Sequence, residues 1–223
     1  MPLQDVIKLA ESQVGITEYP KNSNNVIYNT EYYGKEVNGS AYPWCVTFLW
    51  WVFNHARESK AFFNSGKTAS CGILKTLYQA EGHYYTDEKY IPGDIALMSF
   101  NANKQIQHCG LIIDKKDNDH YITIEGNTSP GLEGSQNNGG CVAKKIRDRW
   151  TIVGVCRPEY SKEPPPSDYI NHWAENNIKW AIQNHIANGY PDGNFKPNEN
   201  ITRAETITLI KNAVDYILEE LKK

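Results

Sequence analysis

The chain has 223 residues, enough for one large domain or for a medium domain followed by a small one. Its formal net charge of −3 excludes the basic surface typical of nucleic-acid-binding proteins, so we expect no nucleic-acid partner. No apolar run approaches the roughly 20 residues that span a bilayer, so we expect no membrane partner. The first residues lack the apolar stretch of a signal peptide, which predicts synthesis in the cytoplasm without an export signal.

Helix signals come first along the chain. Apolar residues recur at helical spacing between Leu3 and Val14, and Gly15 is a plausible stop. Residues 21–40 are rich in Asn and Tyr and predict a structured loop. Pro43 suits the first turn of a helix that runs through Trp44 to about His55. A further helix is expected over residues 72–81.

Strand signals follow from residue 92 onward. Pro92-Gly93-Asp94 predicts a turn into a strand over 95–100. Residues 107–114 alternate, with His108, Gly110 and Ile112 on one face of a strand and Cys109, Leu111 and Ile113 on the other. Residues 121–125 predict the antiparallel neighbour, and later strands are expected around 142–146 and 152–157. Helices followed by an antiparallel sheet indicate an α+β fold.

The three consecutive prolines at 164–166 mark a domain boundary, because they cannot continue a helix or a central strand. We therefore predict a first domain over residues 1–160, a Pro-rich linker over 161–167 and a small helix-loop-helix module over 168–223. In that module, Thr202 is expected to cap the second helix, with Glu205 completing a capping box.

Three residues of the first domain suggest acyl-transfer chemistry. Cys45 lies near the start of a predicted helix, where the helix dipole favours the thiolate. His108 begins one strand and Glu125 ends its neighbour, so an imidazole and a carboxylate should meet near one end of the sheet. A thiol, a base and an orienting carboxylate form the basis of nucleophilic catalysis. Each residue taken alone could instead be structural, since free cysteine is among the most buried residue types.

The remaining cysteines give no sign of a further site. The five cysteines are odd in number and irregularly spaced, which argues against a disulfide framework or a zinc site. We expect Cys71, Cys109, Cys141 and Cys156 to be packing residues, and we expect no metal site and no cofactor.

The motifs Tyr-Pro-Trp-Cys-Val-Thr-Phe, Pro-Gly-Asp-Ile-Ala, Gln-His-Cys-Gly-Leu-Ile-Ile and Ile-Glu-Gly-Asn together resemble the CHAP family. This family comprises cysteine, histidine-dependent amidohydrolases/peptidases with a papain-like (NlpC/P60-type) fold. The resemblance implies that Cys45 is the nucleophile, that His108 is the general base and acid, and that Glu125 and Asn127 support His108. Some family members bind calcium through aspartates ahead of the cysteine; residues 20–44 contain no aspartate, so calcium is left open as a ligand that the sequence does not support.

The resemblance implies a peptidoglycan hydrolase of the kind found in phage endolysins of Gram-positive hosts, acting on the cell wall after release from the cell. We expect an N-acetylmuramoyl-L-alanine amidase. An endopeptidase that cuts the stem or cross-bridge peptide is the enzymatic alternative, and a non-catalytic cell-wall-binding protein is the alternative from another class.

The last module resembles one S-layer homology repeat, through Trp-Ala at 173–174, Gly-Tyr-Pro-Asp-Gly-Asn-Phe at 189–195 and Thr-Arg-Ala-Glu at 202–205. The resemblance implies that it binds a secondary cell-wall polymer of a Gram-positive host. Arg203 is the best candidate for an anionic sugar group, and Trp173, Gly189 and Asp192 are weaker candidates. Because one repeat of about 55 residues buries little apolar surface alone, we expect the module to make the protein a homo-oligomer.

Overall fold

The computed structural model describes residues 2–87, 89–131, 139–161, 168–184, 186–190 and 194–221. The chain divides into two compact units, Met1–Ser161 and Lys162–Lys223. The first unit combines helices with an antiparallel sheet and the second contains helices, so the predicted α+β fold class is confirmed. The proposed linker residues 162–167 lie outside the described part of the chain.

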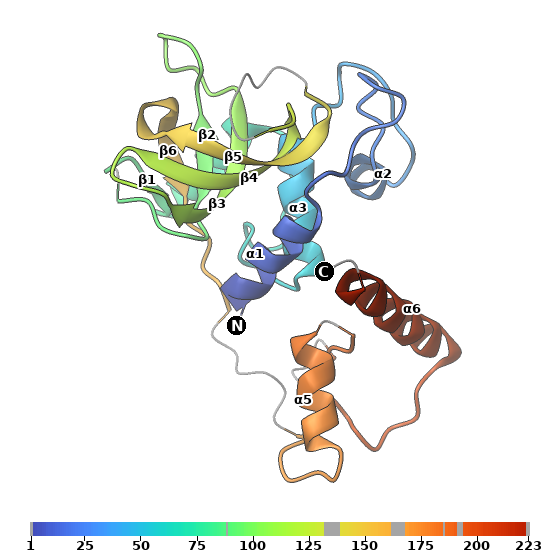
Figure 1. Cartoon of the computed structure of the whole chain (residues 1–223). Helices are drawn as coiled ribbons and strands as arrows, with labels where there is room; N and C mark the ends of the chain where they lie inside the picture. Colours follow the sequence, from blue (N-terminus) through green and yellow to red (C-terminus); the bar gives the residue numbers. More distant parts are fainter. Residues whose placement is uncertain are drawn as a thin grey trace. The chain divides into compact units, whose positions relative to one another are not determined.

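Among the residues that the structure describes, the sheet of the first unit has six antiparallel strands in the order β1-β6-β2-β3-β4-β5 (Figure 1). These strands are β1 (Tyr84–Tyr85), β2 (Ile95–Met98), β3 (His108–Lys115), β4 (His120–Thr128), β5 (Cys141–Asp148) and β6 (Ile152–Cys156). A 3-10 turn, η1 (Arg149–Thr151), joins the last two strands. Because β3 and β4 form an antiparallel hairpin, the start of β3 and the end of β4 lie at the same end of the sheet.

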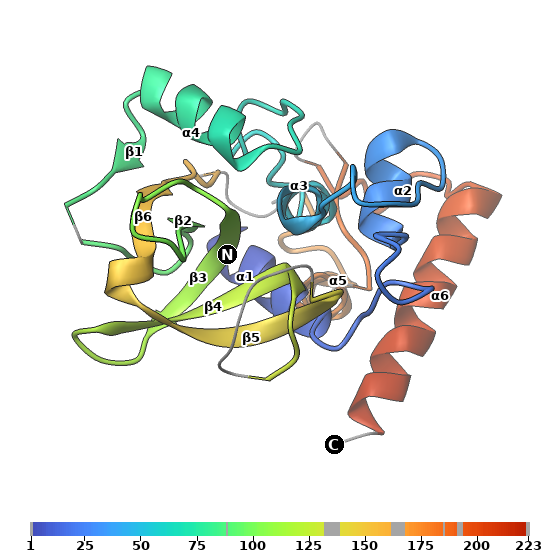
Figure 2. The same ribbon diagram turned by 90° about the horizontal axis from the view of Figure 1, so that it is seen from above.

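The described residues of this unit include four α-helices, which are α1 (Pro2–Ser12), α2 (Ile27–Tyr33), α3 (Cys45–His55) and α4 (Cys71–Ala80). In Figure 2, α1 and α3 lie on the same face of the curved sheet, and both contact β3. The main core fills this space with Val6, Ala10, Phe48, Leu49, Val52, Ile95, Leu97, Cys109, Leu111, Ile124 and Val142. The opposite face carries a second buried cluster of Tyr90, Ala96, Met98, Ile112, Tyr121, Ile152 and Val155.

The alternation predicted for β3 is confirmed, since Cys109 and Leu111 join the core beneath the helices whereas Ile112 joins the cluster on the other face. Helix α3 approaches β4 very closely. A Cβ atom built on Gly126 would lie 2.6 Å from Cβ of Phe48, so a side chain at this position would push the helix away from the strand. Gly126 thereby sets the distance between the helix that carries Cys45 and the strand that carries Glu125.

Three local predictions differ from the structure. The expected loop at 21–40 contains α2, whose Tyr28 packs against Trp44 and Phe48. Its sequence, Ile-Tyr-Asn-Thr-Glu-Tyr-Tyr, is a weak helix former, so tertiary packing stabilises it. Strand β1 was not predicted because it has only two residues. Helix α3 begins at Cys45, so Pro43 precedes its first turn.

The second unit contains α5 (Glu175–Gln183) and α6 (Arg203–Glu220). The rings of Trp180 and Tyr216 meet edge to face at 5.6 Å between centroids. The predicted capping box is confirmed: Glu205 N–H donates to Thr202 Oγ1 at 3.2 Å, and Thr202 N–H donates to Glu205 Oε2 at 2.8 Å. Among the described residues, no helix has the length and apolar character to cross a bilayer.

Candidate active site

Cys45 is the first residue of α3 and is only 6% exposed. The residue before it, Trp44, is fully buried, and its indole N–H donates to Oε2 of the buried Glu18 at 3.2 Å. Glu18 also accepts the backbone N–H of Asn24 at 3.0 Å. This carboxylate therefore fixes the chain segment that leads into the helix, and it was not identified from the sequence because it lies 27 residues before the thiol.

His108 and Glu125 form a buried pair. Nε2 of His108, the first residue of β3, lies 3.0 Å from Oε2 of Glu125 near the end of β4. The imidazole is 3% exposed and the carboxylate is fully buried. Because Glu125 engages Nε2, the ring nitrogen left for the Cys45 thiol is Nδ1. The contact between these two strand ends is the one that the hairpin arrangement predicts.

The carboxylate of Glu125 is held by two further groups. Arg147 of β5 forms a bidentate ion pair with it, through Nε to Oε1 at 2.8 Å and Nη2 to Oε2 at 2.6 Å. Thr123 donates its hydroxyl to Oε1 at 2.6 Å. Burial opposes the charge, but hydrogen bonds from Arg147 and His108 outweigh it and lower the pKa of Glu125 to about 2. Glu125 is therefore an anion at neutral pH.

The strand next to Glu125 leaves room for it at Gly110. A Cβ atom at this position would lie 2.5 Å from Cγ of Glu125. The glycine in His-Cys-Gly is thus required by the close approach of the carboxylate. Neither Arg147 nor Gly110 was assigned a role from the sequence, because the contacts that define their roles join different strands.

The electrostatics of Cys45 and His108 favour an ion pair. Hydrogen bonds from Cys109 and Cys71 and the interaction with His108 lower the pKa of the Cys45 thiol well below its usual range, despite burial. For His108, burial disfavours the charged form, but hydrogen bonds with Cys45 and Glu125 outweigh burial and raise the pKa to about 9. These shifts favour the thiolate form of Cys45 and the imidazolium form of His108, the reactive state of a cysteine nucleophile.

Asn127 lies at an irregularity of β4, where the register with β5 shifts between Glu125 and Thr128. Its φ of 55° is in the left-handed region, which asparagine tolerates better than most residues. The side chain is buried, and its Oδ1 accepts no hydrogen bond from the described residues. The structure thus links the imidazole to Glu125, and a role for Asn127 in supporting His108 stays a prediction.

Two further cysteines surround Cys45. The Sγ atoms of Cys45, Cys71 and Cys109 all lie within 4.8 Å of one another, and the distance between Sγ of Cys45 and Sγ of Cys71 is 3.8 Å. Within the described parts of the chain, this is the group of side chains best placed to hold a metal ion. Cys109 directly follows His108 in the sequence, which could have indicated that it lies near the site. Nothing in the sequence indicated that Cys71 lies near Cys45.

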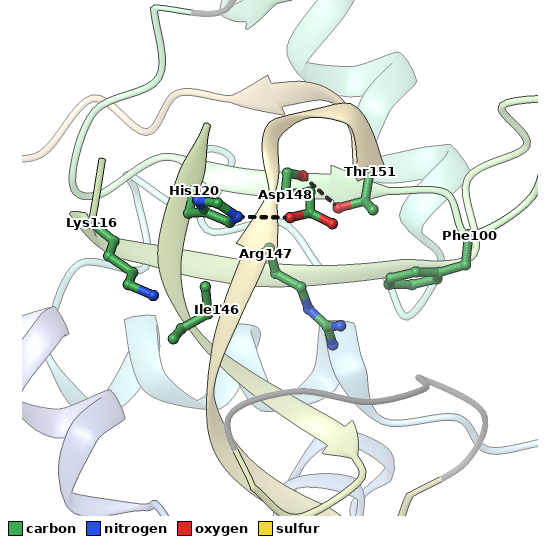
Figure 3. A pocket seen from close by; sticks show the side chains of 7 residues that line it. All are labelled: Phe100, Lys116, His120, Ile146, Arg147, Asp148 and Thr151. Carbon is green, nitrogen blue, oxygen red and sulfur yellow. Dashed lines mark hydrogen bonds and ion pairs between the residues drawn. The ribbon is translucent and has the colours of Figure 1, made fainter. Parts of the chain in front are cut away.

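A polar pocket of about 430 Å³ lies beside the far end of β5 (Figure 3). It is lined by Phe100, Lys116, His120, Ile146, Arg147, Asp148 and Thr151. Cys45 is not among these residues. Arg147 connects the two regions, because its guanidinium pairs with Glu125 and also lies 5.1 Å from the centre of the Phe100 ring.

The predicted wall-binding residues lie on separate segments of the second unit. Trp173 precedes α5 and is 88% exposed, and Arg203 is exposed at the first position of α6. Gly189 is half-buried in the loop between the helices. Asp192 lies outside the described residues.

Comparison with known proteins gives two family matches. Residues 37–127 match the family described as CHAP domain, and residues 167–207 match the family described as S-layer homology domain. Solved structures that are similar to the chain include LysIME-EF1 and Ly7917. The endolysin LysIME-EF1 has a TM-score of 0.40 and 13% identity, with coverage of 72% of this chain and 65% of that chain. Ly7917 has a TM-score of 0.41 and 14% identity, with coverage of 70% and 62%.

Curated relatives match the chain over short segments, and they include two proteins of Acetivibrio thermocellus and one of Thermus thermophilus. Cell surface glycoprotein 1 of Acetivibrio thermocellus is 51% identical over 47 residues, 21% of this chain and 2% of that protein. Outer membrane protein SlpA of Thermus thermophilus is 41% identical over 51 residues, 23% of this chain and 6% of that protein. The Cellulosome-anchoring protein of Acetivibrio thermocellus is 46% identical over 39 residues, 18% and 9% respectively. The chain thus matches less than a tenth of each relative. Both resemblances expected from the motifs are confirmed, because one segment of the chain matches the CHAP domain and a later segment matches the S-layer homology domain.

Proposed function

We propose that this chain is a peptidoglycan hydrolase that cleaves an amide bond by cysteine nucleophilic catalysis. The observation that carries the proposal is the buried series in which Arg147 holds Glu125 and Glu125 holds His108, beside a Cys45 thiol at the start of α3 whose pKa is lowered by Cys109, Cys71 and His108. A purely structural cysteine needs no such series. The CHAP family match, whose members depend on a cysteine, supports the same chemistry.

The proposed reaction has two steps. The Cys45 thiolate attacks the amide carbonyl carbon, and backbone N–H groups at the start of α3, which have no partner within the helix, stabilise the oxyanion. The imidazolium of His108 gives its Nδ1 proton to the leaving amine, which leaves a thioester on Cys45. His108, now neutral, then accepts a proton from water as that water attacks the thioester. Release of the acid restores the thiolate and the imidazolium. Glu125 keeps the ring in position throughout and stays ionised.

We propose that the scissile bond is the link between muramic acid and L-alanine. Digestion of purified peptidoglycan followed by mass spectrometry tests this assignment, because amidase action frees L-alanine amino groups. New termini within the stem or cross-bridge peptide would replace the amidase assignment with an endopeptidase one.

The hydrolase proposal itself is tested with Cys45→Ala. We expect it to lower the rate of peptidoglycan release by more than about a thousandfold while wall binding persists. Cys156→Ala is the matched control, since this buried cysteine belongs to the core and not to the site. Unchanged hydrolysis by Cys45→Ala would reject the proposal, and absence of hydrolysis by the wild-type chain would favour a non-catalytic wall-binding protein.

For the second unit, we propose binding to an anionic secondary cell-wall polymer of a Gram-positive host. Support comes from the S-layer homology match and from the exposed guanidinium of Arg203, whose geometry suits carboxylates. Co-sedimentation with purified cell walls should fall at least about tenfold for Arg203→Ala, the effect of losing one charge-assisted pair. Lys211→Ala, another exposed cation of α6, is the control. Equal losses for both variants would indicate general charge attraction instead.

We further propose that α6 makes the protein a homo-oligomer. One side of this helix carries apolar residues separated alternately by three and four positions, the spacing of a coiled-coil seam. These residues are Ile207, Ile210, Val214 and Ile217, and Leu221 directly after the helix continues the spacing; all five are between 48 and 78% exposed. A copy of the same helix offers a matching row. Light scattering should show an oligomer that becomes monomeric in Ile210→Lys/Ile217→Lys and persists in Thr208→Lys, which lies off the stripe. A strict monomer in the wild-type chain would contradict this proposal.

A further inference from the structure

The three thiols around the nucleophile come from separate parts of the first unit. Cys45 begins α3, Cys71 begins α4, and Cys109 is the second residue of β3. All three are free cysteines. Cys45 and Cys109 are buried, whereas Cys71 is half-buried and gives the cluster its link to solvent. The fold thus gathers three soft sulfur ligands at one point next to the surface.

The spacing of the sulfur atoms suits a tetrahedral metal ion. Two zinc–sulfur bonds of about 2.3 Å at a tetrahedral angle place their sulfurs about 3.8 Å apart. The Cys45–Cys71 Sγ separation is 3.8 Å, and the third sulfur lies within 4.8 Å of both. Side-chain rotations that move the Cys109 sulfur by about 1 Å or less would therefore complete a three-sulfur ligand set.

The charge of the site also suits a cation. Negative charges on three sulfur atoms held this close together would repel one another. A divalent cation at the centre would remove this repulsion and favour all three thiolates, because metal ligation requires deprotonated sulfur. Cys45 and Cys71 are the first residues of α3 and α4, where the helix dipole also favours a thiolate.

We propose that Cys45, Cys71 and Cys109 together bind one thiophilic divalent cation, such as Zn²⁺ or Cd²⁺, and that the bound cation silences the nucleophile. Binding forms three metal–sulfur bonds and releases the thiol protons of Cys71 and Cys109 to solvent. The fourth ligand position is left to water. Silencing follows because the Cys45 electron pair that would attack a carbonyl carbon is shared with the metal; this second part depends on the proposed hydrolase function.

Cadmium titration of the fully reduced chain tests the binding itself. We expect an ultraviolet thiolate-to-Cd²⁺ charge-transfer band that saturates at one ion per chain, and a matching mass increase in native mass spectrometry. Loss of a supporting residue at metal sites typically weakens binding 10–100-fold, so Cys71→Ser and Cys109→Ser should each weaken it by about 100-fold or more. Cys156→Ser, a buried cysteine outside the cluster, should bind as the wild type does.

Circular dichroism checks that each variant is folded, and the half-buried Cys71 is the position least expected to disturb the core. Equal cadmium binding by the wild type and Cys71→Ser would overturn the proposal, as would the absence of a saturable band.

A second experiment tests whether the bound cation blocks catalysis. Zn²⁺ should stop peptidoglycan release by the wild type, and a chelator should restore it. Cys71→Ser should need about 100-fold more Zn²⁺, relative to its own metal-free rate. Because the cadmium band requires no catalysis, failure of the hydrolase proposal would leave the binding result readable.

Discussion

The two units of this chain differ in how far they bury their own side chains. The first unit encloses apolar clusters on both faces of its sheet and also buries the charged groups of Glu125 and Arg147. In the second unit, the described residues include three buried apolar side chains, Tyr169, Ile178 and Ile186. Its exposed large apolar side chains are Ile170, Trp173, Trp180, Ile201, Ile207, Ile210, Val214, Ile217, Leu218 and Leu221.

Side chains therefore have different roles in the two units: buried groups position one another in the first, and exposed groups are available to a partner in the second. Deep burial in the first unit holds an ion pair away from water and fixes the imidazole next to a thiol, which is what catalysis needs. The second unit keeps its apolar and cationic groups at the surface, where a polymer or another copy of the chain can reach them. Substitutions of similar chemistry should therefore have large effects in the first unit and small effects in the second.

The largest difference is expected for ion pairs. Arg147→Met leaves the buried carboxylate of Glu125 without its main partner and should lower the stability of the first unit by about 3–5 kcal/mol. Lys179→Met breaks the exposed pair with Glu175 and should leave stability unchanged within error. Hydrogen exchange resolved by peptide measures the two units separately. If both variants lost hydrogen-exchange protection to a similar extent, the proposed difference between the two units would be contradicted.

A smaller loss of stability is expected when a methyl group is added at a tightly packed glycine. Gly110→Ala places a methyl group against Glu125 and should destabilise the first unit by about 1–3 kcal/mol and slow hydrolysis. Gly72→Ala is the matched control, because the nearest atom to its new Cβ, Oγ of Ser70, is 3.8 Å away and the position is helical. Denaturant unfolding and the rate of peptidoglycan release check both variants. A fully active Gly110→Ala would show that Glu125 is less tightly held than the structure indicates.

The two proposed activities, peptidoglycan hydrolysis and wall binding, should also depend differently on pH. The His108 imidazolium must be protonated to serve the leaving amine, and its pKa is raised to about 9. The protonated fraction therefore falls about tenfold between pH 8 and pH 10, and hydrolysis should fall with it. Wall binding by the second unit does not involve His108, so co-sedimentation should not follow this fall in hydrolysis. Parallel rate and co-sedimentation measurements test this, and a rate that rises steadily to pH 10 would contradict it.

The smallest effect is expected at the start of α6. Thr202→Ala removes the side-chain acceptor for Glu205 N–H and should cost the second unit about 1 kcal/mol. Thr208→Ala, inside the same helix, is the control and should cost less. Thermal unfolding of the second unit, monitored by hydrogen exchange, distinguishes the two variants. An effect as large as that of Arg147→Met would show that the second unit is more cooperative than its burial suggests.

The sequence predicts the parts of this molecule that depend on local patterns. Periodicity places α1, α3 and the two faces of β3, and turn residues mark β2. The positions of Cys45 and His108 at element starts follow from the same patterns. The hairpin also explains why Glu125 meets His108. Contacts between distant segments explain what was missed. Helix α2 depends on packing of Tyr28 against Trp44, and Cys71 reaches Cys45 through the placement of α4. Arg147 reaches Glu125 across a strand pair.

The reactivity of Cys45 as a function of pH tests the central claim most directly. The alkylation rate of the peptide that carries Cys45, followed by mass spectrometry, should already be near its maximum at neutral pH. In His108→Ala the apparent pKa of this thiol should rise, because the stabilising imidazolium is gone. A Cys45 that titrates near 9 in both proteins would contradict the thiolate–imidazolium pair and the catalysis built on it.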